Sequence, residues 1–192
     1  SFYEYCQLLQ LDDMPLLPDH LKITDIPKME NAEVADLMAR FEPLVKHFNR
    51  YLTIGGFPEL ALSDDDLYAQ RMLREDVVDK VIKRDVLTLF KVRSPLLMEK
   101  LFLYLCMNST EIFSATTAAK ELDNISPNTI ESYVDALVKS NLIYMAYPIA
   151  VGSKSVLKGR PKIYIADAAI RNAVLMVDDV LSDERELGLL IE

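Results

Sequence analysis

The residues of this sequence that could do chemistry are basic and small polar side chains in its second half. The first group is a set of four cations in a stretch that has no Asp or Glu between Met145 and Ala166: Lys154, Lys158, Arg160 and Lys162. The second group follows Ser126-Pro127 and consists of Asn128, Thr129, Ser132 and Lys139. Closely spaced cations neutralise nucleic-acid phosphates, and small polar side chains can reach base edges or phosphates. These residues are therefore the candidate contacts to double-stranded DNA.

The same stretch supports a second interpretation. Glu131 and Asp135 would lie on the same helix as the polar candidates and would repel phosphates. A basic segment can also rest on an acidic neighbour within its own protein, and the unit would then serve intramolecular docking. The sequence leaves both interpretations open.

The elements that would position these residues follow the order of a winged helix-turn-helix. We expect helices over 94–108, from about 116, and over 126–140, followed by strands over 142–147 and 162–166. Ser126 is a favoured residue before the first helical turn, and Pro127 suits the first helical position because it has no amide proton to leave unpaired. Asn141 stands where a helix commonly ends. A recognition helix over 127–140 would enter the major groove with its N-terminal residues foremost.

The first half of the chain is also expected to be helical. Apolar residues at helical spacing predict a helix over 32–52, interrupted by Pro43, and a second helix over 67–90. Residues 1–11 suit a helix that packs on another body, and residues 12–30 are expected to form a Pro- and Asp-rich connector. With 5 Gly in 192 residues and 51% hydrophobic residues, the expected fold class is mostly α with a small β-hairpin.

Between the two predicted helices of the first half lies the sequence Gly55-Gly56-Phe57-Pro58. Two glycines after a helix favour a left-handed stop and a tight turn. In the structural interpretation this is a corner with Phe57 in the core. In the functional interpretation, the corner lets the backbone and a flat Pro ring approach a ligand.

Several classes of site are not indicated by the sequence. It has no GxxxxGK[ST] phosphate loop and no GxGxxG turn, and its two histidines, His20 and His47, are not at metal-ligand spacing. We therefore expect no metal site and no catalysis by this chain alone. No apolar run is long enough for a membrane span. Cys6 and Cys106 lie among apolar neighbours and are expected to be buried free thiols, which is typical of a cytoplasmic protein.

The net charge of −9 is unevenly distributed. Residues 1–92 hold 11 basic and 17 acidic side chains, residues 93–166 hold 8 and 6, and residues 167–192 hold 2 and 7. An overall acidic chain is not expected to coat nucleic acid. Of the three segments, only residues 93–166, which hold the predicted winged unit, carry a net positive charge.

Several segments together resemble a family of prokaryotic AAA-superfamily ATPases that carry an uncharacterised C-terminal domain. The matching segments are SFYEY at the start, YLTIGGFPE (51–59), LREDVVDKVIKRDV (73–86), SPNTIESYVDAL (126–137), KIYIADAAIRNA (162–173) and the closing GLLIE. They occur in the family's order and span nearly the whole chain. Members of that family commonly have a Gly-Leu or similar pair where this chain has Ala169-Ile170. This difference bears on the turn expected at these two residues and not on the resemblance as a whole.

The resemblance implies a domain organisation and a set of partners. Residues 1–92 would be a helical lid-type bundle, residues 93–173 a winged helix-turn-helix, and residues 174–192 the start of a truncated C-terminal domain. A restriction-endonuclease-like domain would begin near Glu192. The ATPase core, with its ATP and Mg²⁺, would lie upstream. In related ATPases a corner of the lid contacts adenine, so Gly55, Gly56, Phe57 and Pro58 become candidate nucleotide-sensing residues.

We thus expect a non-catalytic region that couples the nucleotide state of a missing ATPase core to DNA binding or to intramolecular docking. The alternative is a protein-protein interaction scaffold with no nucleic-acid contact. No membrane partner is expected, and a homo-oligomer is compatible with the sequence.

Overall fold

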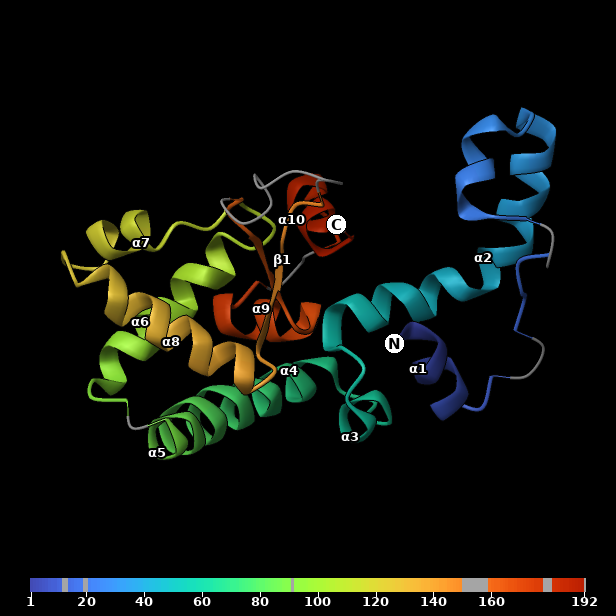
Figure 1. The fold of residues 1–192 in the computed structure, drawn as a ribbon. Helices are drawn as coiled ribbons and strands as arrows, with labels where there is room; N and C mark the ends of the chain where they lie inside the picture. Colours follow the sequence, from blue (N-terminus) through green and yellow to red (C-terminus); the bar gives the residue numbers. More distant parts are fainter. Residues whose placement is uncertain (12–13, 19–20, 91, 150–158, 178–180, 192) are drawn as a thin grey trace.

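The computed structural model describes residues 1–11, 14–18, 21–90, 92–149, 159–177 and 181–191. It is mostly helical, and its strands form a two-stranded antiparallel hairpin (Figure 1). The expected fold class is therefore confirmed. No described helix is both long and apolar enough to cross a bilayer.

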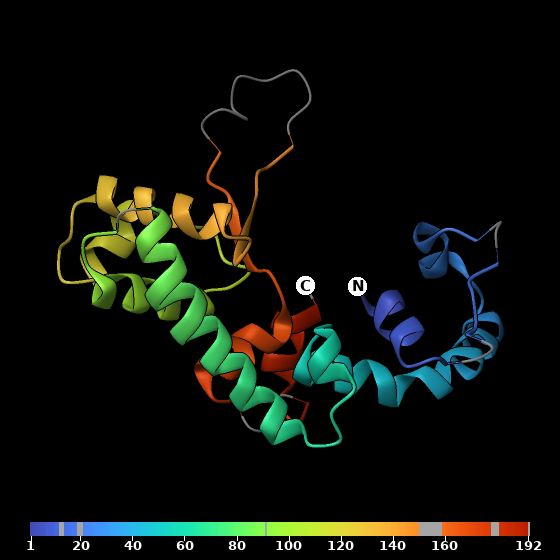
Figure 2. The ribbon, with the colours of Figure 1, turned by 90° about the horizontal axis from the view of Figure 1, so that it is seen from below.

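The N-terminal arm consists of α1 (Phe2–Leu8), the 3-10 helix η1 (Ile23–Lys28) and α2 (Asn31–Ile54). Helix α2 continues through Pro43, and Figures 1 and 2 show that its axis changes direction between its two halves. A proline inside a helix removes one backbone hydrogen bond and bends the axis, as predicted. Helix α1 packs on the second half of α2 through Tyr5 and Cys6, which are buried.

Arg50 of α2 connects the arm to the following segment. Its guanidinium donates to the Tyr5 hydroxyl at 3.2 Å, to the Ala61 carbonyl at 2.8 Å and to the Ser63 carbonyl. It also pairs with Asp66 at 3.0 Å. One side chain thereby joins α1, α2 and the start of α4.

The part of α2 up to Val45 is less buried than its apolar periodicity predicts. Val34, Leu37, Phe41 and Leu44 are only half-buried, and Val45 is exposed. Leu52 and Ile54, at the far end of the helix, are its buried residues. Periodicity identifies an apolar face, but it does not determine whether another element of the same chain covers that face.

A long helical rod follows the arm. The short helix α3 (Pro58–Ala61) and a turn precede the rod. The rod itself is the continuous succession of α4 (Asp66–Arg74), η2 (Glu75–Val86) and α5 (Leu87–Leu89). The predicted helix over 67–90 is therefore confirmed. The winding of η2 is that of a π-helix, which the sequence pattern does not indicate. Such segments are rare and usually short.

The winged unit consists of α6 (Pro95–Met107), α7 (Ala115–Glu121), α8 (Pro127–Lys139), β1 (Ile143–Ala146) and β2 (Lys162–Ile165). Ile143 pairs with Ile165 and Ala146 with Lys162, and Figure 2 shows the hairpin extending away from the helices. Ser126 and Asn141 bound α8 as expected, and Asn141 has φ = 55°. The Ser126 hydroxyl, however, makes no capping hydrogen bond.

The chain then enters α9 (Ala168–Leu175) and α10 (Glu184–Ile191). Helix α9 packs against α2, α4, α6 and β2, and it lies near the centre of the molecule in Figure 1. The main core draws its largest fully buried side chains from the end of α2, the helical rod and the winged unit, among them Ile54, Ile82, Phe102, Leu137 and Ile163. The predicted boundary near residue 92 stays a prediction, and the apolar core runs through it.

Candidate functional site

The corner after α2 has a backbone that only glycine adopts readily. Gly55 has φ = 77° and ψ = −172°, a region that is essentially closed to residues with a Cβ. A Cβ on Gly55 would lie 2.5 Å from Oδ1 of Asp167 and 3.0 Å from the Cβ of Ala169. A Cβ on Gly56 would lie 3.1 Å from the ring of Tyr51. Gly55 is therefore required by its backbone conformation and by close approach, whereas Gly56 is favoured by a tight contact that a small shift of the Tyr51 ring would relieve. The predicted tight corner is confirmed.

Asp167 joins this corner to α9. Its Oδ1 accepts from the Ala169 amide at 2.9 Å and so caps α9, while its Oδ2 accepts from the Gly56 amide at 3.3 Å. Burial raises the pKa of the Asp167 carboxyl, and the two backbone donors only partly offset this rise. Burial also raises the pKa of the neighbouring Tyr51, and the charge of Asp167 raises it further. We call the contact between Asp167 and Gly56 the corner latch.

Two further polar residues of α9 bind distant segments. Asn172, 1% exposed, donates from Nδ2 to the carbonyl of Leu52 at 3.0 Å, and its Oδ1 has no hydrogen-bond partner among the described residues. Arg171, 3% exposed, donates from Nε to the carbonyl of Cys106 at 3.1 Å and pairs with Glu186 at 2.5 Å. Helix α9 thus binds the end of α2 through Asn172, and it binds both the end of α6 and the first turn of α10 through Arg171.

The outer side of the corner is open. Phe57 is 36% exposed, and Pro58 and Glu59 are exposed beside it. The expectation that Phe57 lies in the core is therefore wrong, because the conformation of Gly55 and Gly56 turns the chain outward before Phe57. The corner combines a rigid, buried inner side with an aromatic ring and a proline ring on its surface.

The polar candidates on α8 line a cleft of about 770 Å³ that also includes the start of α6. Asn128 and Ser132 are exposed and Thr129 is half-buried. Arg93, just before α6, borders the same cleft and is exposed. The structure therefore brings Asn128, Thr129 and Ser132 together and adds a cation that the sequence interpretation missed.

The basic candidates are not gathered around that cleft. Lys139 pairs with Asp135 at 2.6 Å, so its charge is largely neutralised on α8 itself. Arg160 is exposed at the start of the returning strand, and Lys162 is half-buried in β2. Lys154 and Lys158 lie outside the described residues.

Metal binding and membrane insertion find no support in the described part of the chain. None of its His, Cys, Asp and Glu side chains form a group of three that could hold a metal ion. Cys6 and Cys106 are buried and unpaired with each other, as expected. Burial raises the pKa of both thiols, to about 12 for Cys106.

Sequence reasoning also missed Asp167, Arg171 and Asn172 as contact residues. The available signal was a set of polar side chains placed before and within an otherwise apolar short helix. Burying a polar side chain costs free energy unless it is hydrogen-bonded. The pattern therefore predicts that these residues have hydrogen-bond partners, but it does not identify the partners.

A family model for a domain of unknown function, DUF8612, matches residues 45–181. The chain belongs to this family. The DUF8612 match includes the corner, the winged unit and α9, and it excludes α1 and the whole first half of α2. Both ends of the corner latch therefore lie within the family domain.

One curated relative is an uncharacterized protein, MJ1544, from Methanocaldococcus jannaschii. It is 25% identical to this chain over 153 residues, which cover 77% of the chain and 34% of the relative. The chain thus spans about a third of the length of that relative. No solved structure matches the chain.

Proposed function

We propose that this chain is the lid and winged-helix region of an AAA-superfamily ATPase, and that it transmits the nucleotide state of an ATPase core to the winged unit. The proposal rests on the sequence resemblance together with one structural observation, the corner latch. Residues 55–58 would sense the nucleotide, and the winged unit would be the output.

The latch supports this proposal because of its position in the chain. Asp167 directly follows β2 and Ala166, and it holds Gly56, which is 111 residues away in the sequence. The Asn172–Leu52 hydrogen bond attaches the same helix to the end of α2. A displacement of the corner therefore has a direct mechanical connection to the hairpin, through two hydrogen bonds and one short helix.

The residues at the corner fit only part of a nucleotide. The exposed rings of Phe57 and Pro58 offer flat apolar surfaces to a base. The chain has no phosphate loop, and its described residues contain no cluster of metal ligands. In this proposal, phosphate binding, Mg²⁺ binding and hydrolysis all belong to the ATPase core.

The experiment uses the longer natural protein that contains this chain. Hydrogen exchange is compared between its ADP-bound form and the form bound to a non-hydrolysable ATP analogue. We expect protection to change together at the corner, in β2 and in α9. In Asp167→Asn the corner should still respond while the response of β2 weakens, because the amide group keeps an oxygen for the cap but presents N–H to the Gly56 amide, and only the Asn172–Leu52 hydrogen bond remains. Absence of nucleotide binding, or changes confined to the core, would refute the proposal.

Asp183→Asn provides a matched control. The Asp183 carboxylate accepts from the Arg185 amide at 2.8 Å and from the Glu186 amide at 3.2 Å, at the start of α10. It has the same capping role as Asp167 but no contact with the corner. Its substitution should leave the coupling intact.

Duplex DNA is the first candidate ligand of the winged unit. The cleft at the start of α8 supplies Asn128, Thr129 and Ser132 together with Arg93, and Arg160 adds a cation near the hairpin. Binding should weaken steeply with salt, and Arg93→Glu or Arg160→Glu should reduce the salt slope by about one phosphate contact each. Arg40→Glu, on the exposed first half of α2, serves as the control. Unchanged affinity in both cleft and hairpin variants would exclude this contact.

A protein-docking scaffold is the second candidate. Glu131 and Asp135 are exposed on α8, and Lys139 is occupied by its pair with Asp135. This charge arrangement opposes the approach of a phosphate backbone to the hairpin-facing side of α8.

A further inference from the structure

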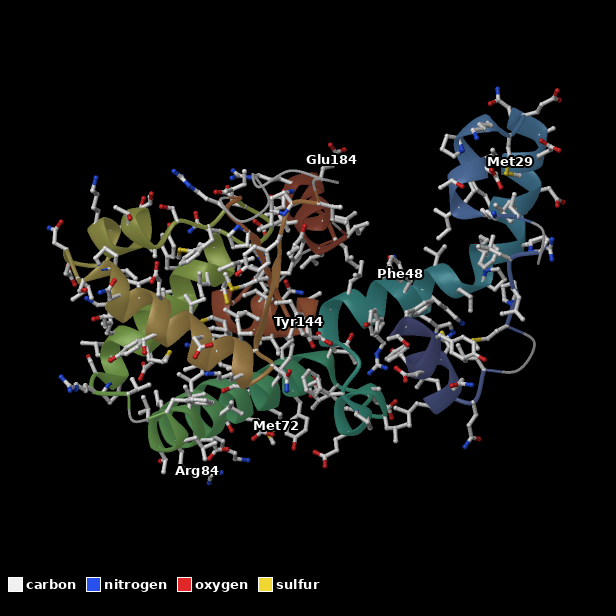
Figure 3. The ribbon with its side chains drawn as sticks, viewed as in Figure 1. Met29, Phe48, Met72, Arg84, Tyr144 and Glu184 are labelled. Atoms are coloured by element: carbon white, nitrogen blue, oxygen red, sulfur yellow. The ribbon has the colours of Figure 1, made fainter. Side chains whose placement is uncertain are left out.

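A second depression lies between α8, the start of α7 and the hairpin, and Asp135 borders both this depression and the polar cleft. It has a volume of about 750 Å³, and its apolar lining comes from Phe113, Val134, Val138, Tyr144, Met145 and Tyr147. Figure 3 labels Tyr144 on β1, and this residue lines the depression together with Val134 and Val138 of α8. We call this depression the hairpin groove.

The composition of the hairpin groove is that of a protein-binding surface. Tyr144 is 54% exposed and Tyr147 is 57% exposed, although both are large apolar-bodied side chains. Met145 and Val138 are half-buried in the floor between them. Tyr and Met are enriched at protein interfaces, where Tyr contributes a large contact area at little cost in conformational entropy.

The charged side chains around the hairpin groove indicate which ligand charge it favours. Glu131 and Asp135 lie on the α8 side, and Glu131 makes no ion pair with any described residue. Arg160 lies on the opposite side, next to β2. A carboxylate without a counter-ion beside an apolar floor favours a ligand that brings a cation next to an apolar side chain. The same carboxylates repel a nucleic-acid backbone.

We propose that the hairpin groove binds a short protein segment in which apolar side chains flank an Arg or Lys. The cation pairs with Glu131 and the apolar side chains cover Tyr144, Met145 and Val138. This inference rests on the proposed function only in treating the winged unit as the output of the module. In this inference the ligand at the hairpin-facing side of α8 is a peptide and not DNA.

The test titrates the isotope-labelled chain with two sets of short peptides of the same apolar composition, one containing Arg and the other containing Glu. A duplex DNA is a third probe. We expect the Arg-containing set to shift the backbone amide signals of Val134, Val138 and Met145, and to bind about fivefold more tightly than the Glu-containing set. Duplex DNA should leave these three signals in place.

Two exposed positions give variants that keep the fold. Glu131→Arg should remove the preference for the basic peptides, and Tyr144→Ser should weaken both sets by about tenfold. Glu42→Arg, on the exposed part of α2, is the matched charge control and should change nothing.

Each other outcome overturns the proposal. If no peptide binds, if both sets bind equally, or if the shifted signals lie outside the groove, the hairpin groove is not a site for such a segment. If duplex DNA shifts the groove signals, the ligand is nucleic acid. Failure here with intact nucleotide coupling leaves the proposed function standing, whereas loss of coupling with retained peptide binding refutes the proposed function alone.

Discussion

Replacing Gly55 with alanine tests whether backbone geometry and close approach hold the corner. The conformation of Gly55 costs a residue with a Cβ about 1–3 kcal/mol. The new methyl group would lie 2.5 Å from Oδ1 of Asp167, so that carboxylate must move. Its movement removes a helix cap, worth about 1 kcal/mol, and the hydrogen bond to Gly56, worth about 1 kcal/mol. We expect Gly55→Ala to destabilise the chain by about 4 kcal/mol.

Alanine substitutions at two other glycines provide comparisons for the expected loss of stability in Gly55→Ala. A Cβ on Gly56 meets only the ring edge of the half-buried Tyr51, at 3.1 Å, so Gly56→Ala should cost about 1 kcal/mol. A Cβ on Gly188, within α10, meets nothing within 4 Å. Gly188→Ala should therefore stabilise the chain by about 0.5–1 kcal/mol through helix propensity.

Urea unfolding followed by circular dichroism measures all three variants. The midpoints should rank Gly188→Ala above the parent chain, then Gly56→Ala, then Gly55→Ala, with similar slopes. A Gly55→Ala variant within about 1 kcal/mol of the parent chain would refute the argument, because strain alone accounts for that much.

Three further predictions concern buried polar and sulfur groups. Folding raises the pKa of the Asp167 carboxyl above its ordinary 3.8, so the contribution of this group to stability is greatest below pH 3.8 and declines as pH rises through the raised pKa. The free energy of unfolding of Asp167→Asn, measured in urea across acidic pH, should lack this decline. Parallel pH profiles for the variant and the parent chain would contradict the prediction. Arg171→Met should cost about 3 kcal/mol, and a double-mutant cycle with Glu186→Met should recover a coupling of about 2 kcal/mol, whereas simple additivity would deny a direct pair. Cys106 should react with a disulfide reagent only as fast as the chain unfolds globally, while Cys6, in the N-terminal arm, should react sooner; equal rates would show that the arm and core open together.

Local structure was predictable wherever the signal was local. The start of α8 at Ser126-Pro127, its end near Asn141, and the two strands of the hairpin all follow from short sequence patterns. The same holds for the tight turn at Gly55-Gly56. These features depend on residues within a few positions of one another, so a single sequence contains what determines them.

The tertiary contacts of the candidate site were not predictable in this way. Asp167 and Gly56 are separated by 111 residues, and nothing in either local pattern indicates the other. Burial also does not follow from local patterns where it depends on distant elements, as the exposed side chains of Phe57 and Val45 demonstrate. Hydrophobic periodicity finds the apolar side of a helix, and only the packing of the whole chain decides which part of that side is covered.

Helix α9 has a consequence for how this protein can be divided. A shortened chain that ends after β2 would retain every helix and strand of the winged unit, yet it would uncover the carbonyls of Leu52 and Cys106, which Asn172 and Arg171 bind. Stable fragments must therefore keep residues beyond the hairpin, and cutting the gene at the edges of the recognisable motif would yield insoluble or partly folded products.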